Sequence, residues 1–136
     1  MNELSSQSAV AEPASHRADS ALAAAQVLDR PHLTRQTLGD TKLERIVLDL
    51  FLQEAPRYAA DIQSAHDIKS WRMAVHTLKG VSLNIGAFRL AQLCRQDEGF
   101  VFGAEGAPPG AAHALSAMID VTVLEIRQVM ASAPAH

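Results

Sequence analysis

The stretch that decides the fold is AVHTLKGVSLNIG, residues 74–86, near the middle of a chain of 136 residues. An α-helix turns about 100° per residue, so apolar residues spaced three or four apart lie on one face. The face opposite His76 carries residues that suit a core, namely Trp71, Ala74, Val75, Leu78, Val81, Ser82 and Ile85. The side of His76 carries Lys69, Arg72, Met73, Lys79, Gly80 and Leu83. The stretch therefore predicts an amphipathic helix whose histidine faces solvent.

Two helices are predicted before this one. A short helix spans about Pro31–Leu38, with Asp29 as its N-cap and Gly39 as a left-handed stop. A long helix begins at Asp40, where Thr41 and Glu44 have the spacing of a capping box. Its apolar stripe comprises Leu43, Ile46, Val47, Leu50 and Phe51 and continues with Tyr58 and Ile62. Because proline lacks a backbone N–H, we expect Pro56 to bend or break this helix.

The histidine helix and the segments after it complete the architecture. Asp67 suits its N-cap, Gly86 ends it, and a further helix extends to about Glu98. The segment 99–110 contains GAEGAPPG and is predicted to be a loop, and a last helix spans about Ala111–Met130. Short connections favour antiparallel neighbours, so the sequence predicts an all-α fold, an up-down antiparallel four-helix bundle with a short additional N-terminal helix. Residues 1–25, rich in Ala and Ser, are predicted to be a flexible arm, and residues 26–136 the bundle domain.

Composition narrows the class of function. The formal net charge of −3 comes without a basic cluster, which argues against partners such as nucleic acid or a membrane surface. No apolar run is long enough to span a membrane, and the first residues lack the pattern of a secretory signal. Cys94 is the single cysteine, so we expect a core thiol and a reducing, cytoplasmic environment. A small acidic domain of this kind is expected to be a monomer.

The surroundings of His76 favour a reactive imidazole. Lys79 lies three residues along, where a fixed cation disfavours a positively charged ring and would stabilise a dianion held on it. Gly80 costs about 1 kcal/mol relative to alanine within a helix, which suggests that something must approach closely there. Leu83, an apolar residue on an exposed face, suits a docking surface. A metal site is disfavoured because the positions four residues away are Arg72 and Gly80, so no bound metal or cofactor is expected.

The segment HTLKGVSLNIGAFRLAQLCRQDE, His76 to Glu98, resembles the histidine-containing phosphotransfer (HPt) domains of two-component phosphorelays. The positions in register are His76, Leu78, Lys79, Gly80, Gly86, Leu90, Cys94 and Glu98, and weaker similarity covers about Asp29 to Met130. The resemblance implies that His76 accepts a phosphoryl group, that Lys79 stabilises it and that Glu98 orients the imidazole. It implies partner docking beside Gly80, and we expect Leu83 and Arg72 to belong to the same docking surface.

The resemblance also implies the partners and the kind of activity. The partners would be receiver domains of response regulators and a hybrid histidine kinase, with Mg²⁺ supplied by the receiver. No G-x-x-x-x-G-K-[ST] loop is present, so the chain is expected to be a phosphoryl carrier and not an ATP-dependent kinase. The alternative is a non-catalytic helical adaptor that docks receivers without exchanging phosphate. A hydrolase is disfavoured because Cys94 and Ser82, the candidate nucleophiles, are predicted to face the core.

One position departs from the family pattern. Asp97 stands where an apolar residue commonly precedes the glutamate. We expect Asp97 to be solvated and the helix to fray early, which makes the placement of Glu98 less secure.

Overall fold

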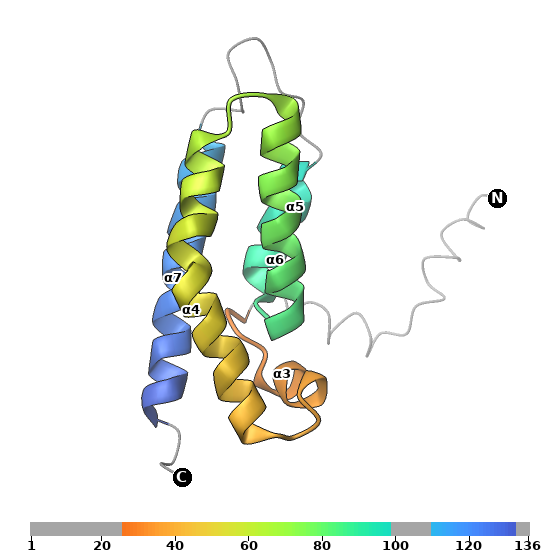
Figure 1. Ribbon diagram of the computed structural model, residues 1–136, viewed down its shortest axis with the longest axis vertical. Helices are drawn as coiled ribbons and strands as arrows, with labels where there is room; N and C mark the ends of the chain where they lie inside the picture. Colours follow the sequence, from red (N-terminus) through yellow and green to blue (C-terminus); the bar gives the residue numbers. More distant parts are fainter. Residues whose placement is uncertain (1–25, 99–109, 133–136) are drawn as a thin grey trace, which may run out of the picture.

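The computed structural model describes residues 26–98 and 110–132, which contain five α-helices (Figure 1). They are α3 (Arg30–Gln36), α4 (Thr41–Ser64), α5 (Ile68–Ile85), α6 (Phe88–Glu98) and α7 (Ala111–Ser132). The last four run alternately up and down as a bundle, and the short α3 lies at one end of it (Figure 1). The predicted all-α architecture is therefore confirmed. The predicted arm over residues 1–25 and most of the predicted loop over residues 99–110 lie outside the described residues.

The long helix α4 differs from its prediction at two points. Its N-cap is Asp40, whose Oδ1 accepts the backbone N–H groups of Lys42 and Leu43 at 3.0 Å each. Thr41 is the first helical residue, so the expected capping box with Glu44 is wrong. The helix is continuous through Pro56, so the predicted break is wrong and the predicted bend stays a prediction. The buried Ala55 and Tyr58 beside the proline hold both sides of it against the core. Core packing here outweighs the loss of one intrahelical hydrogen bond.

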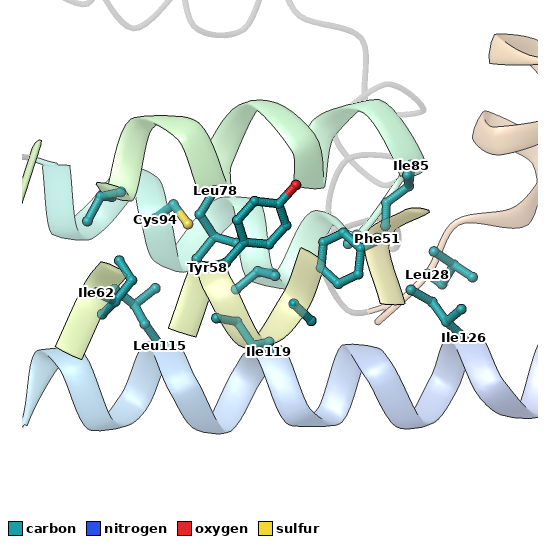
Figure 2. Packing of buried hydrophobic residues seen from close by; sticks show 14 of the residues in the cluster. Leu28, Phe51, Tyr58, Ile62, Leu78, Ile85, Cys94, Leu115, Ile119 and Ile126 are labelled. Carbon is teal, nitrogen blue, oxygen red and sulfur yellow. The ribbon is translucent and has the colours of Figure 1, made fainter. Parts of the chain in front are cut away.

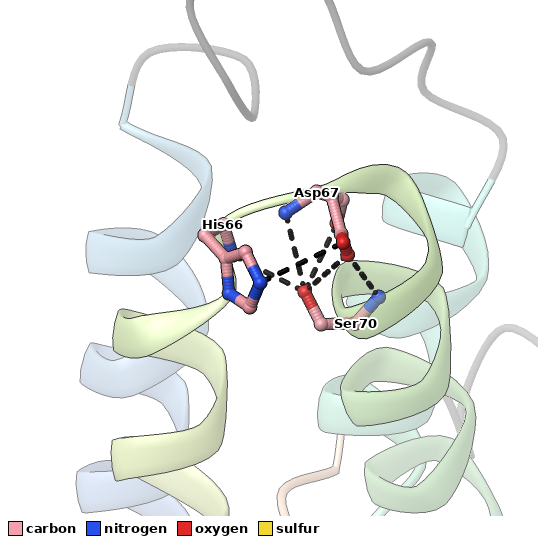
Figure 3. Close-up of polar contacts among 3 residues, drawn as sticks. All are labelled: His66, Asp67 and Ser70. Atoms are coloured by element: carbon pink, nitrogen blue, oxygen red, sulfur yellow. Dashed lines mark hydrogen bonds and ion pairs between the residues drawn. The ribbon is translucent and has the colours of Figure 1, made fainter.

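Asp67 fixes the start of α5, as the sequence predicts (Figure 3). Its Oδ1 accepts the backbone N–H of Ser70 at 2.8 Å, and the Ser70 hydroxyl accepts the backbone N–H of Asp67 at 3.2 Å. The backbone bond from Ser70, with the bond from its hydroxyl, holds the pKa of Asp67 below its usual range. Two otherwise unpaired donors are thus satisfied at the helix end that precedes His76.

Gly86 ends α5 in the left-handed conformation, with φ of +82°. A Cβ at this position would lie 2.8 Å from the carbonyl oxygen of Asp29. Asp29 also donates its N–H to the Gly86 carbonyl at 2.8 Å, and the His32 ring donates from Nε2 to the Leu83 carbonyl at 2.9 Å. These contacts hold α3 against the turn between α5 and α6.

The core fills the space between the four long helices (Figure 2). Its side chains with under 2% exposure include Trp71, Val75, Leu78, Leu90, Cys94, Leu115 and Ile126. Burial raises the pKa of the Cys94 thiol to about 12, so the predicted inert core cysteine is confirmed. Thr122 is tolerated in the apolar face of α7 because its hydroxyl donates to the Met118 carbonyl at 2.8 Å.

Of the helices described, none combines the length and the apolar character that crossing a membrane requires.

Candidate functional site

The site is built on the outward face of α5, which packs between α4 and α6 (Figure 1). The His76 side chain is 74% exposed, as the helical pattern predicts. Its neighbours are less open, because the side chains of Lys79 and Glu98 are 21% and 25% exposed. The imidazole is thus exposed to solvent, while the charged groups of Lys79 and Glu98 next to it are partly buried.

Glu98 joins the two α5 residues from the end of α6. Its Oε2 lies 3.1 Å from His76 Nδ1, and its Oε1 accepts from Lys79 Nζ at 2.8 Å. The hydrogen bond from Lys79, followed by the one from His76, holds the pKa of Glu98 below its usual range. Glu98 is therefore ionised at neutral pH and can only accept hydrogen bonds. We refer to this arrangement of Glu98, His76 and Lys79 as the Glu98 bridge.

The Glu98 bridge selects one tautomer of the ring. Because an ionised carboxylate has no proton to give, the contact at 3.1 Å requires Nδ1 to be the protonated nitrogen. In the neutral ring Nε2 then has a free lone pair, as an attacking nitrogen needs. The arrangement provides an oriented nucleophile with a cation beside it.

A shallow hollow of about 620 Å³ adjoins the imidazole. It is lined by Ile68, Lys69, Arg72, Met73, His76 and Glu98. Arg72 and Lys69 are exposed here, so the predicted basic character of the surface before His76 is confirmed. In the part of the chain that the structure describes, no group of three or more His, Cys, Asp or Glu side chains is placed to hold a metal ion.

Gly80 lies on the open surface one turn after His76. A Cβ built on it would meet nothing within 4 Å, so nothing in the described fold requires a glycine there. Leu83 is half-buried, which is less open than the sequence predicts, and its carbonyl is engaged by His32. Space for a partner thus centres on Gly80 and Arg72 more than on Leu83.

An apolar surface on α4 was not identified from the sequence. The pattern places Leu43, Ile46 and Leu50 in a core stripe, but they are 41%, 60% and 55% exposed. Leu50 borders a small hollow together with Asn84, which lies one turn beyond Gly80 on α5. The apolar stripe of α4 covers more of the helix surface than one buried face can. This excess width is the sequence signal that could have revealed that part of the stripe is exposed. We call Leu43, Ile46 and Leu50 the α4 apolar patch.

The expectation for Asp97 is wrong. The residue is 3% exposed, because α6 continues through Glu98 and the spacing Leu90, Cys94, Asp97 places all three on the core side. Among the described residues its Oδ2 has no hydrogen-bond partner, and burial raises its pKa to about 6. Its backbone carbonyl accepts from Trp71 Nε1 at 3.4 Å. The end of α6 is therefore packed and not frayed, and Glu98 is held in place.

Comparisons with known proteins give a family and a fold for the chain. The family described as "Hpt domain" matches residues 46–132. A solved structure of the HPt domain from a sensor hybrid histidine kinase of Shewanella superimposes with a TM-score of 0.65 at 19% identity. The match covers 80% of this chain and 97% of that one, so the two share a fold. No curated protein sequence matches the chain.

Proposed function

Because the chain belongs to the Hpt domain family, whose members act in histidine phosphotransfer, we propose that His76 is the residue that carries the phosphoryl group in a two-component phosphorelay. The Glu98 bridge is the observation that supports this most directly. It joins an exposed imidazole to a carboxylate at 3.1 Å and joins that carboxylate to a lysine at 2.8 Å.

The proposed acceptance step needs few groups from this chain. The Nε2 lone pair of His76 forms a bond to the phosphorus of a receiver's aspartyl phosphate, and the phosphorus–oxygen bond to that aspartate breaks. The Nδ1 proton stays in place, so positive charge develops on the ring next to the ionised Glu98. Phosphoryl transfer passes through a loose transition state in which positioning and charge neutralisation dominate. In the reverse step a second receiver's aspartate attacks the phosphorus and the phosphorus–nitrogen bond breaks.

Lys79 is proposed to move between two anions. In the described state its ammonium group bonds to Glu98. A phosphoryl group on Nε2 adds further negative charge within reach of the same flexible side chain, and charge-assisted bonds to phosphate oxygens are strong. The Mg²⁺ of the reaction is assigned to the receiver, and none is assigned to this chain.

The face around Gly80 is proposed to dock the receiver. The open space above Gly80 lets a partner backbone approach the helix next to the nucleophile. Arg72 on one side and the α4 apolar patch on the other extend this surface, and Leu83 contributes its half-exposed side chain. A receiver domain and a hybrid histidine kinase are the proposed partners, with the chain acting as a monomer in the cytoplasm.

The test is phosphorylation of the purified chain by phosphorylated receiver domains. We expect a label on the chain that is lost in acid and stable in base, as a phosphorus–nitrogen bond requires, and no label on His76→Gln. His113→Gln is the control, because His113 is an exposed histidine on α7. Equal labelling of His76→Gln and the wild type contradicts the assignment.

The same experiment separates the carrier from the non-catalytic adaptor. An adaptor binds the receiver but acquires no label, and its binding is unchanged by His76→Gln. The Glu98 bridge favours the carrier, since docking alone needs no oriented imidazole.

A further inference from the structure

A buried indole connects the start of α5 to the end of α6. Trp71 is 1% exposed, and its Nε1–H donates to the backbone carbonyl of Asp97 at 3.4 Å. The next residue is Glu98, whose carboxylate returns to α5 at His76 and Lys79. Trp71 and His76 are five residues apart on one helix, so α5, the indole, the end of α6 and the Glu98 bridge form a closed loop of contacts.

The hydrogen bond from the Trp71 indole binds a carbonyl in the last turn of α6. The last four carbonyls of an α-helix have no intrahelical partner, and such ends fray unless another group binds them. Asp97 lies in this last turn, as does Glu98. Among the described residues, Oδ2 of the Asp97 side chain has no hydrogen-bond partner and so does not help to hold this turn. Holding the last turn against α5 thus depends on the indole N–H as well as on apolar packing.

We propose that Trp71 is a positioning residue for phosphotransfer, and that its indole N–H, through the Asp97 carbonyl, sets the Glu98 carboxylate against His76 Nδ1. The proposal rests on the proposed function of His76. A bond of this kind between neutral groups shifts an equilibrium by about two- to tenfold. Losing it should reduce the ratio of bridged to open Glu98 by that factor, and with it the share of the ring protonated on Nδ1.

The sharpest variant removes only the N–H. Trp71 is the only tryptophan in the chain, so biosynthetic replacement of tryptophan by benzothienylalanine, a sulfur isostere without the N–H, changes this position alone. ¹⁵N NMR of the His76 ring then measures the tautomer ratio in the unphosphorylated protein. We expect the ratio of the Nδ1–H form to the Nε2–H form to fall by up to about tenfold, while the thermal transition stays cooperative. An unchanged tautomer ratio overturns the proposal.

A double-mutant cycle separates positioning from a general structural effect. The isostere should slow phosphoryl acceptance in the wild-type background and leave the rate unchanged in the Glu98→Ala background. Equal slowing in both backgrounds assigns Trp71 a structural role and overturns the proposal. Ile126→Val is the control, since it loses buried hydrocarbon on α7, which contributes no residue to the Glu98 bridge, and should leave the tautomer ratio unchanged.

The two readouts also distinguish this proposal from the assignment of His76. If the isostere shifts the tautomer ratio but the wild-type chain takes no label from any receiver, the positioning contact stands and the acceptor assignment fails. If the chain is labelled on His76 and the ratio does not move, the acceptor stands and the role of Trp71 fails.

Discussion

At the scale of single residues, one carboxylate accounts for much of the chemistry at His76. Glu98 uses one oxygen to fix the protonated nitrogen of the ring and the other to hold Lys79 nearby. Because Lys79 is partly buried against this carboxylate, its charge is less screened than that of a fully solvated lysine. The cation is therefore kept next to the proposed nucleophile.

Reversing the charge at Lys79 should impair transfer without unfolding the chain. Lys79→Glu places a second anion beside Glu98 and repels the incoming phosphoryl group, so we expect phosphoryl acceptance to slow by about tenfold or more and the phosphorylated form to be shorter-lived. Rapid-quench labelling measures both quantities. Lys69→Glu makes the same charge change at an exposed position on α5 and should have a smaller effect. Equal rates and lifetimes in wild type and Lys79→Glu would show that Lys79 is only a surface charge.

Asp97 should make the stability of the protein fall as pH rises. Burial raises its pKa to about 6, so the folded state holds the proton more tightly than the unfolded state, where the ordinary value near 3.8 applies. Stability therefore declines between about pH 4 and pH 6, and above that range the buried charge costs about 2–3 kcal/mol. Asp97→Asn should match wild type at pH 4 and exceed it by that amount at pH 7.5, as measured by urea unfolding. Parallel pH profiles of the two proteins would contradict this assignment.

Sequence periodicity assigns both His76 and Asp97 to the correct face, and the expectation for Asp97 is wrong because it followed the charge of the residue instead. The period of 3.6 residues gives the face on which a residue lies, and for His76 the face and the polarity agree. For Asp97 the period favours the core and the charge favours solvent, and the packing between α6 and its neighbours decided in favour of the core. A single sequence does not provide the strength of that packing.

At the scale of elements, the turn between α5 and α6 is one of the places where the chain around α3 is attached to the rest of the bundle. Gly86 is required twice there, once for its φ of +82° and once because the Asp29 carbonyl occupies the space of a Cβ. The sequence predicts the first requirement, since glycine commonly ends helices. It does not predict the second, nor the bond from His32 to the Leu83 carbonyl, because both join segments more than 50 residues apart.

Gly86→Ala should destabilise the protein by more than the cost of placing alanine at a positive φ, because the new Cβ also meets the Asp29 carbonyl. The variant places a methyl group 2.8 Å from the Asp29 carbonyl, so α3 or the turn must shift. We expect a loss of about 2–3 kcal/mol in the free energy of unfolding, against about 1 kcal/mol for Gly39→Ala. Gly39 is the matched control, with φ of +75° and nothing within 4 Å of its Cβ position. Chemical denaturation of both variants gives the comparison, and equal losses would show that the close approach of α3 contributes nothing.

At the scale of the whole molecule, two surface features of α4 and α5 lower the stability of the folded domain. The α4 apolar patch is exposed, and Gly80 lies within the continuous helix α5, so both features cost the isolated domain stability. Leu50 of the patch borders a hollow with Asn84, which is one turn after Gly80, and Gly80 is one turn after His76. A partner that covers this surface would remove the exposed apolar side chains from water, and this burial would favour binding.

Gly80→Ala should therefore separate stability from function. A Cβ at Gly80 meets nothing within 4 Å and alanine favours the helix, so the free energy of unfolding should rise by about 0.5–1 kcal/mol. If a receiver needs the open space, the more stable variant should transfer phosphate more slowly, and Gly80→Gln, with a longer side chain, more slowly still. The His76 tautomer ratio should be the same in all three proteins, because no side-chain atom of His76 or Glu98 lies within 4 Å of a Cβ built at Gly80. Transfer at the wild-type rate in Gly80→Gln would mean that the receiver does not dock over Gly80.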